Sequence, residues 1–248
     1  MEEAQALADQ AALLADRTRA TFCLALLDGR AWTAGELARE AKVAVSTASE
    51  QLDRLVGGGL LTEHRQGRHR YLRLAGPETA AVIEMIAAAG KRTDERPRTM
   101  AAAHRQRNLR FARTCYDHLA GVAGVALADG LIGNGLIDNH NGLVLTGPGR
   151  TALSEAGIET APDTQRPVLR ECIDWTERRP HLAGAIGAAI CRHAFGAGWI
   201  ERIGSGRAVR VTPAGVRDLE RYLGVVIDPA ERERSAAAPA VPAGARRP

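Results

Sequence analysis

Two short helices separated by a few residues, close to a basic hairpin, are the feature that most constrains how this chain can fold. Residues 33–41 read TAGELAREA, in which Thr33 and Glu36 have the spacing of a capping box at a helix start. Residues 46–57 read STASEQLDRLVG, which predicts a second helix that is capped at Ser46 and ends at a glycine run. Such a pair predicts a helix-turn-helix unit.

The segment after the second helix is typical of a β-hairpin. Residues 60–74 read LLTEHRQGRHRYLRL, with apolar ends and Gln66-Gly67 where the tip belongs. Helical spacing of apolar residues also predicts helices over 4–28 and 77–89. The order of helices with a hairpin after the second helix of the pair is that of a winged helix-turn-helix.

Residues 13–89 resemble the ArsR/SmtB (arsenic-repressor-like) family of bacterial transcription regulators. The residues that carry the likeness are ELA in the first helix, S-T-x-S at the start of the second, L-x-x-L-x-x-x-G-L-L at its exit, and GRHRYLRL in the wing. The resemblance implies a homodimer that binds palindromic double-stranded DNA as a repressor, with dimer contacts from residues 4–15 and 77–89. A core role for helix 77–89 within one chain is the alternative.

In a winged helix-turn-helix the second helix enters the major groove and reads base edges, while basic side chains of the wing contact phosphates. The candidate DNA-binding residues are Thr33, Ser46, Thr47, Ser49, Gln51 and Arg54 around the helices, and Arg65, Arg68, His69 and Arg70 in the wing. Gln51 suits adenine and Arg54 suits guanine or phosphate. A wing that only binds protein is the alternative, but its positive charge favours DNA.

The second half contains an internal repeat. RTCYD from Arg113 parallels RECID from Arg170, and HLAGVAGVAL from His118 parallels HLAGAIGAAI from His181. Each copy predicts a helix, a short hairpin and a further helix opened by Thr-x-x-Gly, at Thr146 and Thr212. We therefore expect two degenerate winged-helix-like repeats packed as one domain.

The repeated segments carry side chains that bind zinc or softer metals. Cysteine, histidine and carboxylate ligands suit such ions, and the candidate metal ligands are Cys115, Asp117, His118, Cys172, Asp174 and His181. Three interpretations stay open: metal or thiol-redox sensing through Cys115 and Cys172, a small-molecule effector pocket, and structural duplication with buried cysteines and helix-borne polar groups. The resemblance adds no metal site, because the segments GELAREAKV and PETAAVIEMIAAA lack a ligand set.

Charge and composition narrow the function further. Residues 91–113 contain eight Lys or Arg residues and two acidic ones, a local charge of +6. Such a stripe indicates either a polyanionic partner or a solvated linker and helix face. The chain has no apolar run near the ~20 residues of a membrane span and no signal peptide, so we expect a cytoplasmic protein without membrane contact. Its four cysteines form no CxxC pair, and nothing around them resembles a catalytic cysteine, so we do not expect an enzyme.

The expected fold class is mainly α with short β-hairpins (α+β). The expected domains are a DNA-binding and dimerisation domain (1–90), a basic linker (91–103), a duplicated, mostly helical effector or dimer domain (104–227) and a disordered tail (228–248). No cofactor is firmly predicted.

Overall fold

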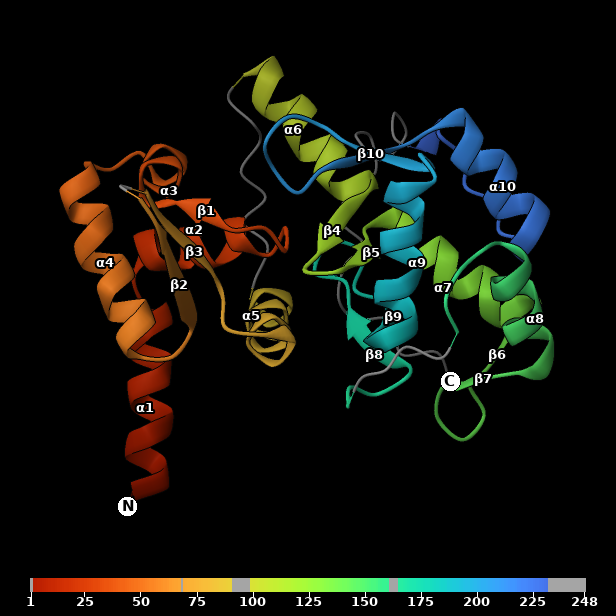
Figure 1. Ribbon diagram of the computed structural model, residues 1–248, viewed down its shortest axis with the longest axis horizontal. Helices are drawn as coiled ribbons and strands as arrows, with labels where there is room; N and C mark the ends of the chain where they lie inside the picture. Colours follow the sequence, from red (N-terminus) through yellow and green to blue (C-terminus); the bar gives the residue numbers. More distant parts are fainter. Residues whose placement is uncertain (1, 68, 91–98, 161–164, 232–248) are drawn as a thin grey trace, which may run out of the picture.

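The computed structural model describes residues 2–67, 69–90, 99–160 and 165–231. The chain forms two halves that lie side by side, with α1 projecting from the first (Figure 1). The elements of the first half are α1 (Glu2–Leu14), α2 (Arg17–Leu26), β1 (Trp32–Thr33), α3 (Ala34–Ala41), α4 (Val45–Gly57), β2 (Leu61–Gln66), β3 (His69–Leu74) and α5 (Pro77–Ala89).

The first half is a winged helix-turn-helix, as the sequence predicts. Its three antiparallel strands have the order β1-β3-β2, and Leu61 lies opposite Leu74 at the base of the wing. Apolar side chains from α2, α3, α4 and the sheet form one core, because each helix turns its leucines inward. The largest fully buried members are Phe22, Leu26, Leu27, Leu37, Leu52, Leu55, Leu72 and Leu74. This core fixes α4 beside the wing.

Two details of the predicted helices are wrong. The segment 4–28 is not one helix: α1 ends at Leu14, and Asp16 starts α2 by accepting a hydrogen bond from the Arg19 amide at 2.9 Å. Helix α4 begins at Val45 and has no side-chain cap, so Ser46 lies inside its first turn. In the first case Asp16 caps a new helix, although the helical spacing of apolar residues continues across it.

The second half begins with α6 (Met100–Phe111), which takes in the end of the predicted linker. Its other elements are β4 (Arg113–Cys115), β5 (His118–Ala120), α7 (Val122–Gly133), β6 (Ile137–Asp138), β7 (Val144–Leu145), α8 (Gly147–Glu155), β8 (Arg170–Ile173), β9 (Pro180–Ala183), α9 (Gly184–Gly196), β10 (Ile200–Arg202), β11 (Val209–Val211) and α10 (Pro213–Leu223).

Each repeat runs hairpin, helix, hairpin, helix. The sequence predicted that each repeat begins with a helix carrying its Asp and His residues. This prediction is wrong. A strand pair forms instead: β4–β5 closes through Tyr116, whose φ of 60° lies in the left-handed region, and β8–β9 closes over a longer loop. The expected hairpins β6–β7 and β10–β11 follow.

The Thr-x-x-Gly motifs act as predicted. Thr146 and Thr212 each accept a hydrogen bond at 3.0 Å, from the amides of Gly149 and Gly215. Both glycines are needed, because a Cβ there would collide with the carbonyl of Leu136 or Trp199. The motif therefore packs helices α8 and α10 against the preceding turn.

The first helix of each repeat packs on the first hairpin of the other repeat. Helix α7 packs on β9 and α9 packs on β5, so each helix covers the hairpin of the other repeat. A Cβ at Gly124 of α7 would lie 3.7 Å from the His181 Cβ, and one at Gly187 of α9 would lie 3.4 Å from the His118 Cβ. This reciprocal arrangement brings the two Cys–His hairpins together.

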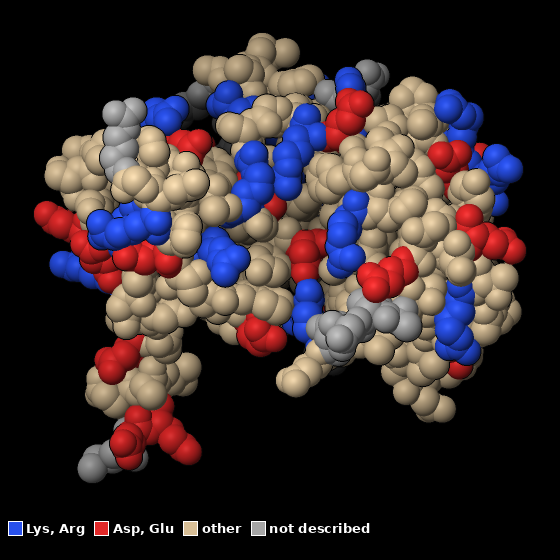
Figure 2. All heavy atoms as spheres, in the orientation of Figure 1, with Lys and Arg blue, Asp and Glu red and all other residues tan. Residues whose placement is uncertain are grey.

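The two halves are joined by polar contacts. The Tyr116 amide donates to the Leu27 carbonyl at 2.6 Å, and Arg202 donates to the Asp28 carbonyl at 3.3 Å. In the face shown in Figure 2, basic side chains gather along this junction and acidic ones at the free end of α1. No helix among the described residues is both long and apolar enough to cross a membrane.

The predicted basic stripe is only partly a surface feature. Lys91, Arg92, Arg96 and Arg98 lie outside the described residues, as does most of the predicted tail. Arg113 is fully buried, and Arg110 pairs with Glu177 at 3.1 Å. Arg113 therefore supports the fold and does not face a polyanion.

Candidate functional site

The outer face of α4 carries exposed polar side chains. Ser46, Thr47 and Arg54 are exposed and Ser49 is half-buried, whereas Ala48, Leu52 and Leu55 on the opposite face are buried. The helix is therefore fixed by its apolar face and presents donors that can bond to bases or phosphates.

Gln51 is held by the first half itself. Its Oε1 accepts a hydrogen bond from Arg19 Nη1 at 2.5 Å. Arg19 is buried and also donates to the carbonyls of Leu13 and Ala12, at 2.6 and 2.9 Å. Arg19 thus ties the end of α1 to α4, a role that no motif in the sequence indicates.

Thr33 acts as the helix cap. Its amide donates to Glu36 Oε2 at 2.7 Å, its hydroxyl accepts from the Glu36 amide at 3.3 Å, and the capping box is complete. The hydrogen bond from the Thr33 amide, with one from its hydroxyl, lowers the pKa of the Glu36 carboxyl. Thr33 therefore orients α3, and its hydroxyl is occupied.

The wing presents fewer unpaired charges than its sequence suggests. Arg65 and His69 are exposed, whereas Arg68 lies outside the described residues. Arg70 pairs with Asp53 of α4 at 2.7 Å and with Glu63 of β2 at 2.5 Å. Arg70 therefore fastens the wing to α4. Glu63 is its neighbour on the other strand of the same hairpin, whereas Asp53 becomes its neighbour only when α4 packs beside the wing.

Two helices of the first half expose apolar side chains. No residue of α1 is buried, and Leu7 is 73% exposed. Helix α5 buries Ala80, Ala81 and Ile83, but it exposes Val82, Met85 and Ile86. Helix α5 thus has one face in the monomer core and a second face in solvent.

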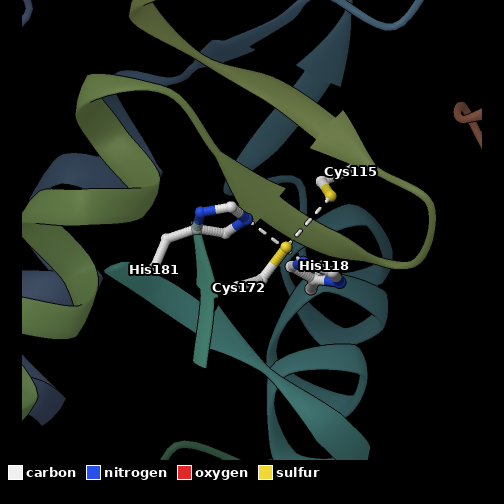
Figure 3. A group of neighbouring side chains, drawn as sticks. All are labelled: Cys115, His118, Cys172 and His181. Atoms are coloured by element: carbon white, nitrogen blue, oxygen red, sulfur yellow. Dashed lines mark hydrogen bonds between the residues drawn. The ribbon is translucent and has the colours of Figure 1, made fainter. Parts of the chain in front are cut away.

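The second half gathers four of the six candidate metal ligands into one cluster, which we call the Cys–His cluster: Cys115, His118, Cys172 and His181. All four are buried, and their ligand atoms lie within 4.8 Å of one another (Figure 3). Cys115 lies opposite His118 in β4–β5, and Cys172 lies opposite His181 in β8–β9. Each repeat therefore contributes one thiol and one imidazole.

The other two candidates, Asp117 and Asp174, lie behind the histidines. Asp117 Oδ1 is 3.2 Å from His118 Nδ1, and Asp174 Oδ2 is 3.8 Å from His181 Nδ1. Arg166 holds Asp117 at 2.5 Å, and the fully buried Arg113 holds Asp174 at 2.8 Å. The two carboxylates thus lie where they can orient the imidazoles.

The cluster favours a thiolate at Cys172. The pKa of Cys172 is lowered by hydrogen bonds from Cys115 first and then from the two histidines, against the effect of burial. Burial and the neighbouring Cys172 raise the pKa of Cys115. Burial raises the pKa of Cys23 and of Cys191 to about 12, so these two remain thiols. Cys172 is therefore the sulfur of the four that most readily becomes a thiolate, the form that binds metal.

An ion pair connects α5 to the second half. Glu84 of α5 and Arg207 of the segment before β11 lie 3.0 Å apart, and both are buried. Burial lowers the pKa of Arg207, although Glu84 partly offsets the effect. Neither residue was a predicted site residue, because a lone charge in each segment carries no sign of its distant partner.

A helix-turn-helix core with an adjoining wing defines the class of winged helix-turn-helix regulators. Residues 14–64 match the family described as a helix-turn-helix domain. The uncharacterized HTH-type transcriptional regulator YdfF of Bacillus subtilis (strain 168) is 37% identical over 218 residues, which cover 87% of this chain and 96% of that protein. The chain therefore belongs to the family of HTH-type transcriptional regulators, and the helix-turn-helix transcription regulator expected from the sequence motifs is confirmed.

Solved structures resemble about a third of the chain. The homodimeric winged helix-turn-helix domain of Mb0332 from Mycobacterium bovis, a possible ArsR-family regulator, is 26% identical, with a TM-score of 0.33 over 36% of this chain and 81% of that chain. HlyU from Vibrio cholerae N16961 is 22% identical, with a TM-score of 0.33 over 35% of this chain and 94% of that chain.

Proposed function

We propose that this regulator is a homodimeric repressor that binds a two-fold-symmetric operator in the cytoplasm. The observation that carries the proposal is the exposed row of Ser46, Thr47 and Arg54 on α4, beside the arginine-bearing wing. In this arrangement α4 enters the major groove and the wing follows the DNA backbone. No enzymatic step is part of the proposal.

Helix α4 and the wing contact different parts of the DNA because they carry different side chains. Arg54 reads guanine or a phosphate, and Ser46, Thr47 and Ser49 bond to bases or phosphates from the first turns of α4. In the wing, Arg65 and His69, together with Arg68, contact phosphates or the minor groove. The remaining candidates support this surface through contacts within the protein. Gln51 contacts Arg19, and Thr33 contacts Glu36. Arg70 contacts both Asp53 and Glu63.

Dimerisation is supported by the exposed helices. A 13-residue helix is marginal in water unless an apolar face is packed, and α1 buries no residue within the monomer. Val82, Met85 and Ile86 of α5 have the i, i+3, i+4 spacing of one helix face and are 44%, 59% and 52% exposed. Exposed apolar faces of this kind mark protein interfaces. A second copy of the chain would cover both helices and place two α4 helices on one operator.

The test is a titration of the full-length protein against DNA from its own upstream region and against a scrambled duplex of the same composition. We expect binding of both that weakens with salt, and a preference of roughly 10³-fold or more for the upstream DNA. Equal affinity for the two duplexes at every salt concentration would contradict an operator-binding function. Repression is then read from a reporter fused to the same upstream region.

A further inference from the structure

The geometry of the Cys–His cluster is that of a tetrahedral metal site. In such a site, with Zn–S near 2.3 Å and Zn–N near 2.05 Å, two sulfurs are separated by about 3.8 Å and two nitrogens by about 3.3 Å. The Cys115 and Cys172 sulfurs are 3.8 Å apart, and the His118 and His181 Nε2 atoms are 3.2 Å apart. These two distances match those of a tetrahedral zinc site, and all four ligand atoms lie within 4.8 Å of one another.

The orientation of the histidines supports the same conclusion. The two imidazoles face each other through Nε2 inside the cluster (Figure 3). Their Nδ1 atoms lie toward Asp117 and Asp174. Metal-bound histidines generally have this arrangement, in which an outer carboxylate fixes the ring and its tautomer. Among the described residues, His181 Nδ1 has no hydrogen-bond partner, and Asp174 is its nearest carboxylate.

The carboxylates are themselves held in place. Asp174 accepts hydrogen bonds from the Gly121 amide at 2.6 Å and from the Thr176 amide at 2.8 Å, besides its pair with Arg113. Asp117, behind the other imidazole, is held by Arg166 at 2.5 Å. A fixed negative charge behind each imidazole favours a cation in front of it.

A purely structural role explains the cluster less well. A cysteine that acts as a small hydrophobe packs among aliphatic side chains, as Cys191 does in the large core of the second half. Cys115 and Cys172 share a small apolar cluster with two alanines, but their sulfurs also contact each other beside two imidazoles whose Nε2 atoms face one another. When each imidazole carries its proton on Nδ1, toward its aspartate, both Nε2 atoms are bare acceptors that face each other, and a cation between them satisfies both.

We propose that Cys115, His118, Cys172 and His181 form a closed binding site for one thiophilic divalent cation, for which zinc is the best fit. Two thiolates and two imidazoles in tetrahedral array are typical of zinc, and four protein ligands without an open position define a structural site. Since each repeat supplies one cysteine and one histidine, the ion fastens the two repeats together. The site goes beyond operator binding and does not depend on it.

The first test uses Co²⁺ as a spectroscopic probe of the full-length protein, reduced and freed of metal under anaerobic conditions. We expect one equivalent per chain to bind, with the ligand-field absorption of tetrahedral Co²⁺ and a thiolate charge-transfer band, and Zn²⁺ to displace it stoichiometrically. Zn²⁺ at about 100 times its Kd should raise the melting temperature by about 5–10 °C. Absence of stoichiometric binding, or binding without the thiolate band, would overturn the proposal.

Variants assign the ligands. Cys172→Ser and His181→Gln should each weaken metal binding by more than the roughly 10–100-fold typical of changes to outer groups. Cys191→Ser is the matched control, because Cys191 is buried in the same half outside the cluster and should leave the metal affinity unchanged. Unchanged affinity in both ligand variants would overturn the site. A Cys115–Cys172 disulfide in metal-free protein isolated without oxygen would assign the pair to redox chemistry instead.

Discussion

Glu84 and Arg207 form a buried ion pair at 3.0 Å that connects α5 to the second half of the chain. Removing one partner leaves an uncompensated buried charge, so Glu84→Leu or Arg207→Met should each lower the free energy of unfolding by about 3–5 kcal/mol. The double variant should recover most of that loss, because neither charge remains. Urea denaturation of the four proteins measures this cycle. A double variant as unstable as the sum of the single ones would show that the two residues act independently.

The wing should supply affinity without sequence preference. Arg65 is 73% exposed and lies next to the tip, so Arg65→Ala should weaken binding to specific and scrambled DNA alike. One lost phosphate contact lowers the slope of log K against log salt by about one. Arg192→Ala is the control, because Arg192 of α9 is exposed to a similar extent, 66%, and its loss should change neither quantity. An unchanged salt slope in Arg65→Ala would remove Arg65 from the interface.

Replacing Gln51 should lower the stability of the fold more than it changes the preference for particular bases. Gln51→Ala removes the acceptor of the buried Arg19 and should cost about 1–3 kcal/mol of unfolding free energy. Gln51→Glu keeps that acceptor and should preserve stability. Thermal unfolding of both variants, followed by competition with base-substituted duplexes, separates the two roles. A fully stable Gln51→Ala protein with altered base preference would restore Gln51 as an adenine reader.

The exposed face of α5 should control the oligomeric state. Ile86→Glu places a charge in the proposed dimer interface, so it should shift sedimentation from dimer to monomer at micromolar concentration and weaken binding to palindromic DNA. Val144→Glu on β7 is the matched control, since Val144 is exposed to a similar extent, 56% against 52% for Ile86. A dimer of unchanged strength in Ile86→Glu would exclude this face of α5.

Much of the first half could be predicted from its sequence because local signals and global packing agree there. The Thr33–Glu36 capping box, the glycine exit of α4 and the apolar ends of the wing each specify a short element. Helix α5 spans the predicted residues, Pro77–Ala89, since proline suits its first turn. The break before Asp16 was missed because the apolar period continues across it.

The candidate sites were harder to predict, because their partners are distant in sequence. Asp53 binds Arg70, and Arg19 binds Gln51, only once α4, the wing and α2 pack together. In the second half, the repeated Cys and His residues were visible in the sequence. Each Cys lies opposite its His in a hairpin, and the two hairpins meet because α7 packs on β9 and α9 packs on β5. No local sequence pattern indicates this packing.

The most direct test of the central claim is selection of DNA from a random library by the full-length protein. We predict enrichment of an inverted repeat whose half-site centres lie about one helical turn, or a small multiple of 10–10.5 bp, apart, because two α4 helices related by a two-fold axis read one face of the duplex. Loss of that enrichment in Arg54→Ala would assign the reading to α4. Recovery of random sequences alone, from a protein that is folded and binds DNA at low salt, would contradict a sequence-specific dimeric regulator.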